Sequence, residues 1–415
     1  MESVHTLKTI LKHRLLRPSR GGIMLAATVF LGTLFSCTAQ RKAVPDLADL
    51  DLVGAYHREP VDWTAERFGP HVSFVDENGK ERWLSEGFLF QEAVDNKGGR
   101  IFCVSPSGRS ADKASWERQL DLWLGADGAV AELDKACAAA AGRIGKPSRP
   151  RYVVITVPDP VMFEYFSDKS SSTDYWGAVD GRQLDFQDVN DQITAVKWYI
   201  DETRRRFDSL DCKYLELAGF YILSEELHLS FGETEIERLN HQYKRWETII
   251  PAVAEYCHAA KEGLYWVPYH LAPGYKHWKE LGFDMAAMQP NYYWDLKSPG
   301  AHPFDRTIEA IKEYGLGMEI EFEYSCVADI MKVEKKGPDG AGRLIFDESD
   351  VPALKDRLRE YFTRMKASGL YGVAPIVIYS GSDALTQLAT SSDPADHALY
   401  LELCHFIVES PLRHR

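Results

Sequence analysis

Residues 152–157 read YVVITV, residues 188–207 read DVNDQITAVKWYIDETRRRF, and residues 214–223 read YLELAGFYIL. The outer two runs are short and apolar, and the segment between them is longer and amphipathic. A short apolar run predicts a buried strand, and an amphipathic segment of this length predicts a helix. The stretch therefore predicts the strand, helix and strand of a parallel βαβ unit.

The same alternation continues on both sides of this stretch. Eight strands with helical crossovers match a closed (β/α)8 TIM barrel, and an open doubly wound sheet is the alternative. The nucleotide-binding patterns G-x-G-x-x-G after the first strand and G-x-x-x-x-G-K-[ST] do not occur, so no cofactor is expected. The predicted strands are Leu52–His57, Gly87–Glu92, Tyr152–Val157, Tyr214–Leu223, Leu264–Tyr269, Asp284–Gln289, Leu316–Glu323 and Val373–Tyr379. The predicted helices are Ser115–Leu124, Ala129–Arg143, Asp188–Phe207, Glu233–Ala260, Phe304–Tyr314, Val351–Ser368 and Asp393–Val408.

The first 36 residues differ in kind from the rest of the chain. Five basic residues precede an apolar run, Ile23–Phe35, which is too short to span a bilayer and is typical of a secretion signal. The run ends Leu-Phe-Ser-Cys37, which resembles a bacterial lipobox, where the cysteine is acylated. We therefore expect a signal peptide at residues 1–36, a lipid-anchored tether at 37–51 and one barrel domain at 52–410. The protein would be exported, at a periplasmic or cell-surface membrane. An ordinary signal peptide cleaved nearby is the alternative.

Charge and cysteine content exclude several classes of protein. The formal net charge is −14. Removal of residues 1–36 leaves 43 basic and 61 acidic side chains, or about −18, so no nucleic-acid partner is expected. The basic run Arg204–Arg206 is read as the solvated face of a helix. Six scattered cysteines follow Cys37 without a C-x-x-C pair, so buried free thiols are expected and no metal site is predicted.

The seventh predicted strand carries an unusual row of acidic residues. Glu319, Glu321 and Glu323 alternate with apolar residues and therefore share one face. Helices cover the outer face of a parallel barrel, so the row is expected to point inward, toward the mouth where substrate enters. If the barrel is wrong, the row is only the solvated face of an antiparallel strand.

The fourth predicted strand also ends in carboxylates, Glu225 and Glu226, after Ser224. Acidic residues often precede a helix, so a purely structural role in helix capping is the alternative to a catalytic role. Glutamates at the ends of strands four and seven, however, are what glycosidic cleavage requires. One carboxylic acid protonates the leaving oxygen, and one carboxylate attacks the anomeric carbon or activates water.

This placement resembles the clan A glycoside hydrolases, whose acid/base follows strand four and whose nucleophile ends strand seven. The resemblance implies Glu225 as acid/base and Glu321 as nucleophile. Ser224 stands where the clan usually has Asn, which leaves Glu226 as a rival of Glu225, and Glu319 and Glu323 are alternatives to Glu321 as nucleophile. Nearly end to end, the chain also resembles domain-of-unknown-function family 4855, exported bacterial proteins suspected to be glycosidases. The motifs that carry this resemblance are Gly87-Phe88-Leu89-Phe90, Trp198-Tyr199-Ile200-Asp201-Glu202, Gly219-Phe220-Tyr221, Gln289-Pro290-Asn291-Tyr292 and Glu319-Ile320-Glu321-Phe322.

Aromatic and polar residues follow several predicted strands and are expected at the same rim. Aromatic rings stack on sugars, and amide side chains hydrogen-bond sugar hydroxyls. Trp176, Trp266, Tyr292 and Trp294 are expected to include at least two stacking platforms. The full set of predicted substrate-binding residues is Trp176, Trp266, Tyr269, His270, Gln289, Asn291, Tyr292, Trp294 and Asp159.

The leading hypothesis is a retaining glycoside hydrolase that cleaves an extracytoplasmic oligo- or polysaccharide. Glu225 and Glu321 are then expected to lie about 5 to 5.5 Å apart, whereas roughly 6.5 to 9.5 Å would indicate inversion. A non-catalytic carbohydrate-binding barrel is one alternative. A metal-dependent hydrolase that uses Asp159, His270 and the Glu row is another, although no H-E-x-x-H occurs. The sequence defines neither the sugar nor the oligomeric state.

The N-terminal pattern predicts that Cys37 is lipidated. The mature protein should partition into the detergent phase because its N-terminal cysteine carries acyl chains. Mass spectrometry of the mature N-terminus should find a diacylated or triacylated Cys37. A Cys37→Ser variant should lose the modification and move to the aqueous phase, and an unmodified wild-type terminus at another residue would refute the prediction.

Overall fold

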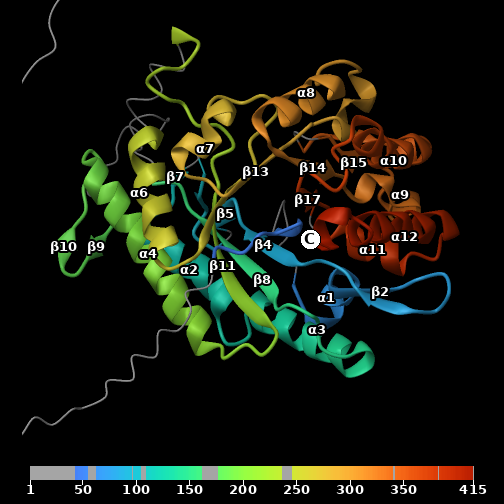
Figure 1. Ribbon diagram of the computed structural model, residues 1–415, viewed down its shortest axis with the longest axis horizontal. Coiled ribbons are helices and arrows are strands. Elements are labelled where there is room, and N and C mark those ends of the chain that lie inside the picture. Colours follow the sequence, from blue (N-terminus) through green and yellow to red (C-terminus); the bar gives the residue numbers. More distant parts are fainter. Residues whose placement is uncertain are drawn as a thin grey trace, which may run out of the picture. The chain divides into compact units, whose positions relative to one another are not determined.

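Eight parallel strands form a closed barrel (Figure 1). The computed structural model describes residues 43–54, 62–95, 97–103, 109–160, 176–235, 245–339, 342–381 and 383–414. Around the barrel the order is β1, β4, β8, β11, β12, β13, β14 and β17, and β17 pairs with β1 to close the ring. The predicted (β/α)8 barrel is therefore confirmed, and these strands correspond to the eight predicted ones. They are β1 (Asp49–Gly54), β4 (Gly87–Gln91), β8 (Arg151–Val157), β11 (Leu215–Ile222), β12 (Gly263–Trp266), β13 (Met285–Met288), β14 (Gly317–Glu321) and β17 (Ile376–Tyr379).

Helices lie on the outer side of the strands (Figure 1). For example, α4 packs on β8 and β11, α6 on β12, and α10 on β14. The seven predicted helices correspond to the longer ones, although residues 236–244 of the predicted Glu233–Ala260 helix lie outside the described part of the chain. None of the described helices is long and apolar enough to cross a membrane. The α-helices are α1 (Ala65–Val72), α2 (Lys113–Leu124), α3 (Ala129–Ile144), α4 (Val189–Ser209), α6 (Trp246–Ala259), α7 (Trp278–Leu281), α8 (Phe304–Tyr314), α9 (Ala328–Glu334), α10 (Val351–Ser368), α11 (Ala384–Thr390) and α12 (Pro394–Val408).

Short strands decorate the connections between barrel elements. They form small sheets separate from the barrel, and sequence reasoning missed them because two or three residues carry no periodicity. These strands are β2 (Ser73–Val75), β3 (Glu81–Trp83), β5 (Val94–Asp95), β6 (Arg100–Ile101), β7 (Arg109–Ser110), β9 (Ala178–Val179), β10 (Arg182–Gln183), β15 (Gly337–Pro338) and β16 (Leu344–Phe346).

The first strand begins earlier than predicted. β1 starts at Asp49 rather than Leu52, so the predicted tether at residues 37–51 is too long at its end. The first half of the strand contains two buried aspartates, so it does not appear in the sequence as an apolar run. Asp49 accepts a hydrogen bond from the backbone N–H of Glu86 (2.8 Å) and lies 3.3 Å from Arg413, which compensates its burial. Residues 55–57 of the predicted strand and Cys37 lie outside the described part of the chain.

A bulge shapes the strand that leads to Glu225. The pairing of β11 with β8 shifts between Leu217 and Gly219. Gly219 has φ +153°, and a Cβ there would lie 2.0 Å from the Gly263 carbonyl oxygen on β12. Only glycine fits this close approach of two backbones. The bulge therefore directs the second half of β11, and with it the loop that carries Glu225.

A buried polar cluster links the first strand to the C-terminal helices. His71 Nδ1 on α1 contacts Asp51 Oδ2 on β1 at 2.7 Å, and both side chains are completely buried. The other ring nitrogen of His71 contacts Thr386 Oγ1 on α11 at 3.1 Å, and Ser85 Oγ donates to Asp51 at 3.2 Å. The cluster thus joins elements from both ends of the domain.

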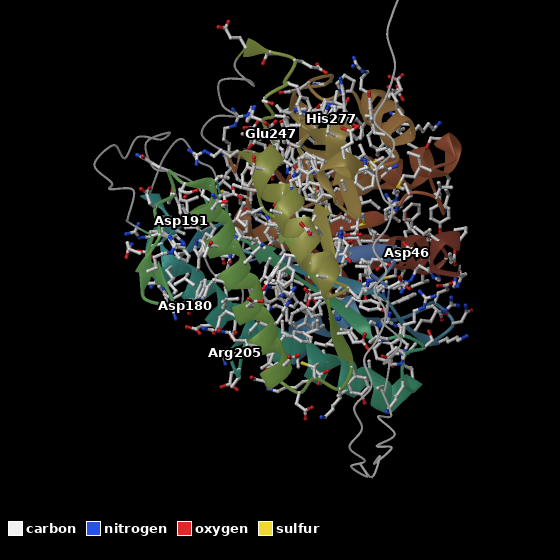
Figure 2. The ribbon with its side chains drawn as sticks, turned by 60° about the vertical axis from the view of Figure 1, so that its left-hand side comes forward. Asp46, Asp180, Asp191, Arg205, Glu247 and His277 are labelled. Carbon is white, nitrogen blue, oxygen red and sulfur yellow. The ribbon has the colours of Figure 1, made fainter. Side chains whose placement is uncertain are left out.

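The basic run on α4 is only partly the solvated face that the sequence predicted. Arg205 is exposed and pairs with Glu202, and Figure 2 shows it at the outer surface of α4. Arg204 is largely buried and reaches Glu262 at 2.6 Å, and Arg206 is also largely buried. These two arginines therefore anchor α4 rather than face solvent.

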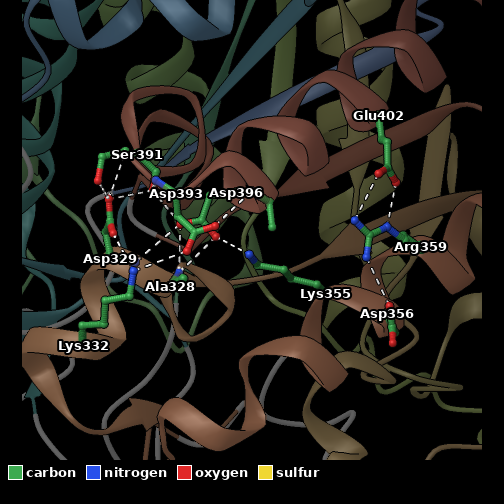
Figure 3. Close-up of polar contacts among 12 residues, drawn as sticks. Ala328, Asp329, Lys332, Lys355, Asp356, Arg359, Ser391, Asp393, Asp396 and Glu402 are labelled. Carbon is green, nitrogen blue, oxygen red and sulfur yellow. Dashed lines mark hydrogen bonds and ion pairs between the residues drawn. The ribbon is translucent and has the colours of Figure 1, made fainter.

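A second buried cluster ties the last helices together (Figure 3). Asp396 on α12 is fully buried and pairs with the buried Lys355 of α10. The same carboxylate accepts the backbone N–H of Ala328 (2.9 Å), at the start of α9, and the hydroxyl of Ser391 (2.6 Å). One carboxylate thus satisfies donors from three separate segments.

We predict that Asp396→Ala lowers the free energy of unfolding by roughly 3 to 5 kcal/mol, because it leaves the Lys355 ammonium buried without its partner. Urea denaturation provides the measurement. Glu402→Ala is the control, since it breaks a more exposed ion pair with Arg359 (2.8 Å, Figure 3) and should cost less than about 1 kcal/mol. Equal losses in the two variants would contradict the prediction.

Candidate active site

The glutamate row of β14 is buried in the barrel. Glu319, Glu321 and Glu323 are all buried, and so are the apolar residues that alternate with them. Both faces of the strand are therefore covered, as expected in a parallel barrel. The interpretation of the row as a solvated face is wrong.

Glu321 is the member of the row with the most hydrogen-bond donors. Its Oε1 accepts the backbone N–H of Asn291 (3.0 Å), and its Oε2 accepts the hydroxyl of Tyr361 (2.6 Å) on α10. The backbone of Tyr292 adds a further hydrogen bond. Asn291 has φ +54°, a conformation that asparagine tolerates better than most residues and that presents its N–H to the carboxylate.

Burial and neighbouring charges raise the pKa values of Glu319 and Glu321. The charges of Glu321 and Glu225 raise the pKa of Glu319 further, well above its ordinary value, and no hydrogen bond lowers it. For Glu321, the donors named above oppose the effect of burial. Burial still raises the pKa of Glu321 to about 8, but its donors make it the more readily ionised of the two, so Glu319 holds its proton more firmly than Glu321.

Glu225 lies at the end of the fourth barrel strand, as predicted, on a loop fixed to its neighbours. The backbone carbonyl of Ser224 accepts the indole N–H of Trp266 (2.7 Å), and that of Glu225 accepts the N–H of Tyr269 (3.0 Å). Burial is the largest cause of the raised pKa of Glu225, and the charge of Glu226 adds to it. A hydrogen bond from Gln289 lowers the pKa of Glu225, but only in part.

Glu225 and Glu321 are close enough to interact electrostatically, because the charge of Glu225 raises the pKa of Glu321. The separation of about 5 to 5.5 Å between their carboxyl groups stays a prediction. Glu226 differs from both, since its side chain is exposed and contacts His228 at 3.1 Å. No described helix begins at Ser224, so the capping interpretation has no support there.

Tyr269 stands beside these carboxylates at the end of a hydrogen-bonded chain. Its hydroxyl lies 2.8 Å from His302 Nε2, and His302 Nδ1 lies 2.9 Å from Asp295 Oδ1. The Asp295 carboxylate can only accept a hydrogen bond, so Nδ1 of His302 donates to it. Burial raises the pKa of Tyr269, and the charges of Glu225 and Glu321 raise it further.

His270 is half-buried, and its ring meets that of His302 edge-on, with centroids 5.2 Å apart. Burial and the nearby His302 lower the pKa of His270 to about 4, so its ring is neutral at neutral pH. Its Nδ1 contacts Thr307 Oγ1 at 3.1 Å. Sequence reasoning missed His302 and Asp295, because they lie in a connection after β13 rather than directly at a strand end.

Three of the predicted stacking platforms do not offer a free face. Trp176 and Trp266 are core residues: Trp176 stacks on Phe186 (5.5 Å between centroids) and Trp266 on Phe283 (5.4 Å). Tyr292 stacks on Phe304 (4.9 Å) and lies under the Arg357 guanidinium (4.2 Å). The rings are covered because helices pack against these strand ends, which no local pattern reveals. The prediction fails for these three residues in this structure.

Trp294 differs from the other three predicted platforms. Its half-buried ring meets Tyr293 and Tyr379 edge-on, and its indole N–H has no hydrogen-bond partner within the described residues. The hydroxyl of Tyr379 donates to Glu323 Oε1 at 3.2 Å. Burial and the charge of Asp339 raise the pKa of Glu323 to about 8. Asn291 likewise has a buried side-chain nitrogen without a partner in the described residues, so both residues have a donor to offer.

Asp159 is buried just after β8, where its backbone N–H donates to the carbonyl of Phe102 (2.8 Å). The charges of Asp159 and Glu225 raise the pKa of Cys103, which places Cys103 near both groups. Glu92, after β4, is also buried, and burial raises its pKa to about 8. Nothing in the sequence pattern distinguished Cys103 as a neighbour of the site.

The described cysteines form no disulfide, and the six are free thiols. Within the same described ranges, no group of three or more His, Cys, Asp or Glu side chains is arranged to hold a metal ion.

The fold and the site define this protein as a TIM-barrel protein with buried carboxyl groups at the carboxyl ends of its strands. The chain belongs to the family described as Domain of unknown function (DUF4855), whose model matches residues 50–337. The resemblance seen in the sequence motifs is therefore confirmed. None of the curated proteins matches the chain in sequence.

Several solved structures are similar to this chain at low identity. One is a protein from Bacteroides thetaiotaomicron VPI-5482 with a provisional assignment as an α-L-fucosidase (12% identity, TM-score 0.44, 92% of this chain and 99% of that chain). Another is the second catalytic domain of a group II chitinase from Ostrinia furnacalis (10% identity, TM-score 0.45, 88% and 96%). A third is the YdhT protein from Bacillus subtilis (9% identity, TM-score 0.34, 85% and 84%). The reaction must therefore be inferred from the residues of the site.

The raised pKa of Glu323 predicts a measurable pH dependence of stability. Below about pH 4.5 the carboxyl is protonated in both the folded and unfolded states, so its burial carries no charge penalty. Between pH 4.5 and about 8 the unfolded state releases the proton and the folded state keeps it, so stability falls as pH rises.

Glu323→Gln should remove this loss and gain on the order of 1 to 4 kcal/mol over wild type at pH 9, but little at pH 4. Urea denaturation of both proteins at the two pH values measures the difference. Glu309→Gln, at an exposed position on α8, should show no such gain. A Glu323→Gln difference that is the same at pH 4 and pH 9 would rule the mechanism out.

Proposed function

We propose that this protein is a retaining glycoside hydrolase in which Glu225 is the acid/base and Glu321 the nucleophile. The observation that carries the proposal is the electrostatic interaction between the half-buried Glu225, which follows β11, and the buried Glu321, at the end of β14. Their environments differ as the two roles require. Glu225 has a raised pKa and keeps its proton, whereas Glu321 has three donors that stabilise its charged form.

In the first step, the Glu321 carboxylate oxygen attacks the anomeric carbon as the glycosidic C–O bond breaks. Glu225 transfers its proton to the leaving oxygen, which departs as an alcohol, and a covalent glycosyl ester forms on Glu321. In the second step, water attacks the anomeric carbon, the Glu225 carboxylate takes the water proton, and the ester bond to Glu321 breaks. The two inversions together retain the anomeric configuration.

Surrounding residues support these roles by reducing charge repulsion at Glu321 and by orienting both carboxyl groups. A protonated Glu319 removes one like charge from beside Glu321, so that Glu321 can carry the nucleophilic charge. Tyr361 and the Asn291 N–H hold Glu321 in one orientation. Gln289 anchors its own side chain on the Val267 carbonyl (3.1 Å) and hydrogen-bonds Glu225, which orients the acid.

The N-terminal sequence places this activity outside the cytoplasm in our proposal. A lipidated Cys37 would anchor the protein to a membrane, and its carbohydrate substrate would be an exported or environmental oligo- or polysaccharide. Because the site combines acceptor oxygens with amide donors, its complement is a polyhydroxylated ligand.

A non-catalytic carbohydrate-binding barrel is the second candidate. It is favoured by the raised pKa of Glu321, because a fully protonated row would only hydrogen-bond sugar hydroxyls. The two candidates differ in one observable, which is the release of product.

We predict that the wild-type protein releases sugars from at least one polysaccharide in a broad panel, with retained anomeric configuration by NMR. Glu321→Gln should lower kcat by at least about 1,000-fold while glycan binding persists, because the amide cannot attack. Glu225→Gln should impair substrates with poor leaving groups most, since these depend on protonation.

Glu309→Gln is the control on α8 and should retain full activity. Binding of glycans by wild-type protein without product from any substrate would favour the non-catalytic barrel. Product with inverted configuration would remove Glu321 as nucleophile.

A further inference from the structure

Two aromatic side chains stand out among the strongly exposed large hydrophobic residues of the described chain. Phe231 is 55% exposed and Tyr269 is 38% exposed, whereas the other residues of this kind are aliphatic. Aromatic rings offer a flat apolar face with which sugars stack. Both rings belong to the loops that follow β11 and β12, two neighbouring strands of the barrel.

A pocket of about 210 Å³ lies between these two loops. This is more than ten times the ~15 Å³ that one water molecule needs, so the pocket has room for a larger ligand. The residues that line it include Leu229, Phe231, Tyr275, Lys276, His277 and Arg306. It combines apolar rings with charged side chains, which suits a ligand with both apolar faces and hydroxyl groups.

Backbone contacts fix the walls of the pocket. The N–H of Leu227 donates to the carbonyl of Pro273 at 2.9 Å, which joins the two loops. Gly274, at φ +90°, lies so close to Leu227 that a Cβ there would be 2.6 Å from the Leu227 carbonyl oxygen. The pocket is therefore held in shape without a ligand.

The exposed ring of Phe231 is held at the edge of this pocket. Ser230, next to Phe231, donates through its N–H and its hydroxyl to Glu247 at 2.9 and 2.7 Å. The Phe231 ring meets His277 edge to face, with centroids 4.9 Å apart. Glu247 and His277, the two residues that hold this segment, are labelled in Figure 2. Phe231 is thus held by the Ser230–Glu247 hydrogen bonds and by the ring of His277, and its side chain is still exposed.

Two residues that line the pocket lie close in sequence to residues of the proposed catalytic centre. Leu227 follows Glu225 by two residues, and Leu271, on the opposite wall, follows Tyr269 by two residues. Two residues of extended chain span at most ~7 Å, which is about the length of one sugar unit. A glycan whose cleaved bond lies at Glu225 would therefore reach the pocket with its next units.

The charged groups of the pocket are already positioned as hydrogen-bonding groups. Lys276 pairs with Glu233, and His277 Nδ1 lies 2.8 Å from Glu280. Arg306 contributes a guanidinium whose nearest carboxylate, Glu309, lies 3.8 Å away. Paired charges of both signs suit a neutral polyhydroxyl ligand better than an ion, because neither sign dominates the pocket.

We propose that this pocket is a distal glycan subsite that stacks one sugar ring on Phe231, so that the substrate is an oligo- or polysaccharide chain rather than a short glycoside. The proposal rests on the proposed glycosidase function for the position of the cleaved bond. Binding of a longer glycan chain depends on the pocket itself and is measured separately from cleavage.

The test compares binding as a function of chain length in the Glu321→Gln background, which prevents turnover. Cello-, xylo-, malto- and chito-oligosaccharides of two to six units are titrated by calorimetry. For any series that binds, affinity should rise with length, and Phe231→Ala should weaken the longest member about tenfold and the shortest little. Val373→Ala, an exposed apolar position before β17 at the opposite end of the barrel, is the matched control and should change neither.

Equal affinity of the Phe231→Ala and parent proteins for the longest binding member would overturn the proposal, and so would a failure of all four series to bind. Product release by the wild-type protein is scored in parallel. Binding that depends on length and on Phe231 without hydrolysis would preserve the subsite and remove the hydrolase. Hydrolysis that depends neither on chain length nor on Phe231 would support the hydrolase and rule out the subsite. Melting temperatures of all variants verify that each is folded.

Discussion

The pairing of β1 with β17 is the interaction on which the rest of this structure depends. It closes the parallel sheet, so that no strand edge is left open and both faces of every barrel strand are covered. Closure is what buries the carboxyl groups of β14, and burial is what raises their pKa values. The same acidic row on an open antiparallel sheet would be ordinary solvated surface. The electrostatics of the site therefore follow from the topology of the sheet.

The closed fold buries charged side chains, which is unfavourable unless they have partners. Two buried polar clusters supply those partners. Asp51 with His71 ties the first strand to α1 and α11, and Asp396 with Lys355 ties α12 to α10 and α9. Each cluster satisfies a buried charge with partners from distant segments, which makes the arrangement specific even if its net contribution to stability is small. The first cluster lies between a barrel strand and its helices, and the second lies among the helices. They leave the carboxyl ends of the strands free for chemistry.

The site divides its work between two kinds of residue. Strand ends supply the carboxyl groups, while the connections supply the residues that orient them and contact the ligand. Tyr361 on α10 holds Glu321, and Asp295 through His302 holds Tyr269. The loops after β11 and β12 are joined by backbone hydrogen bonds, so Glu225, Tyr269 and Phe231 belong to one rigid surface. Chemistry and recognition thus share the same two loops.

The sequence by itself determined the barrel, its eight strands, and the positions of Glu225 and the β14 glutamates at strand ends, because periodicity and residue type are local properties. It misplaced the start of β1, since Asp49 is acceptable in a buried strand only with Arg413 near the other end of the chain. It also read Trp266 and Tyr292 as sugar platforms, whereas Phe283, Phe304 and Arg357 cover their rings. Only the tertiary structure decided which aromatic faces are free and which carboxyl groups share a proton. Both depend on what packs against a residue from elsewhere in the chain, and a linear pattern contains no record of those neighbours.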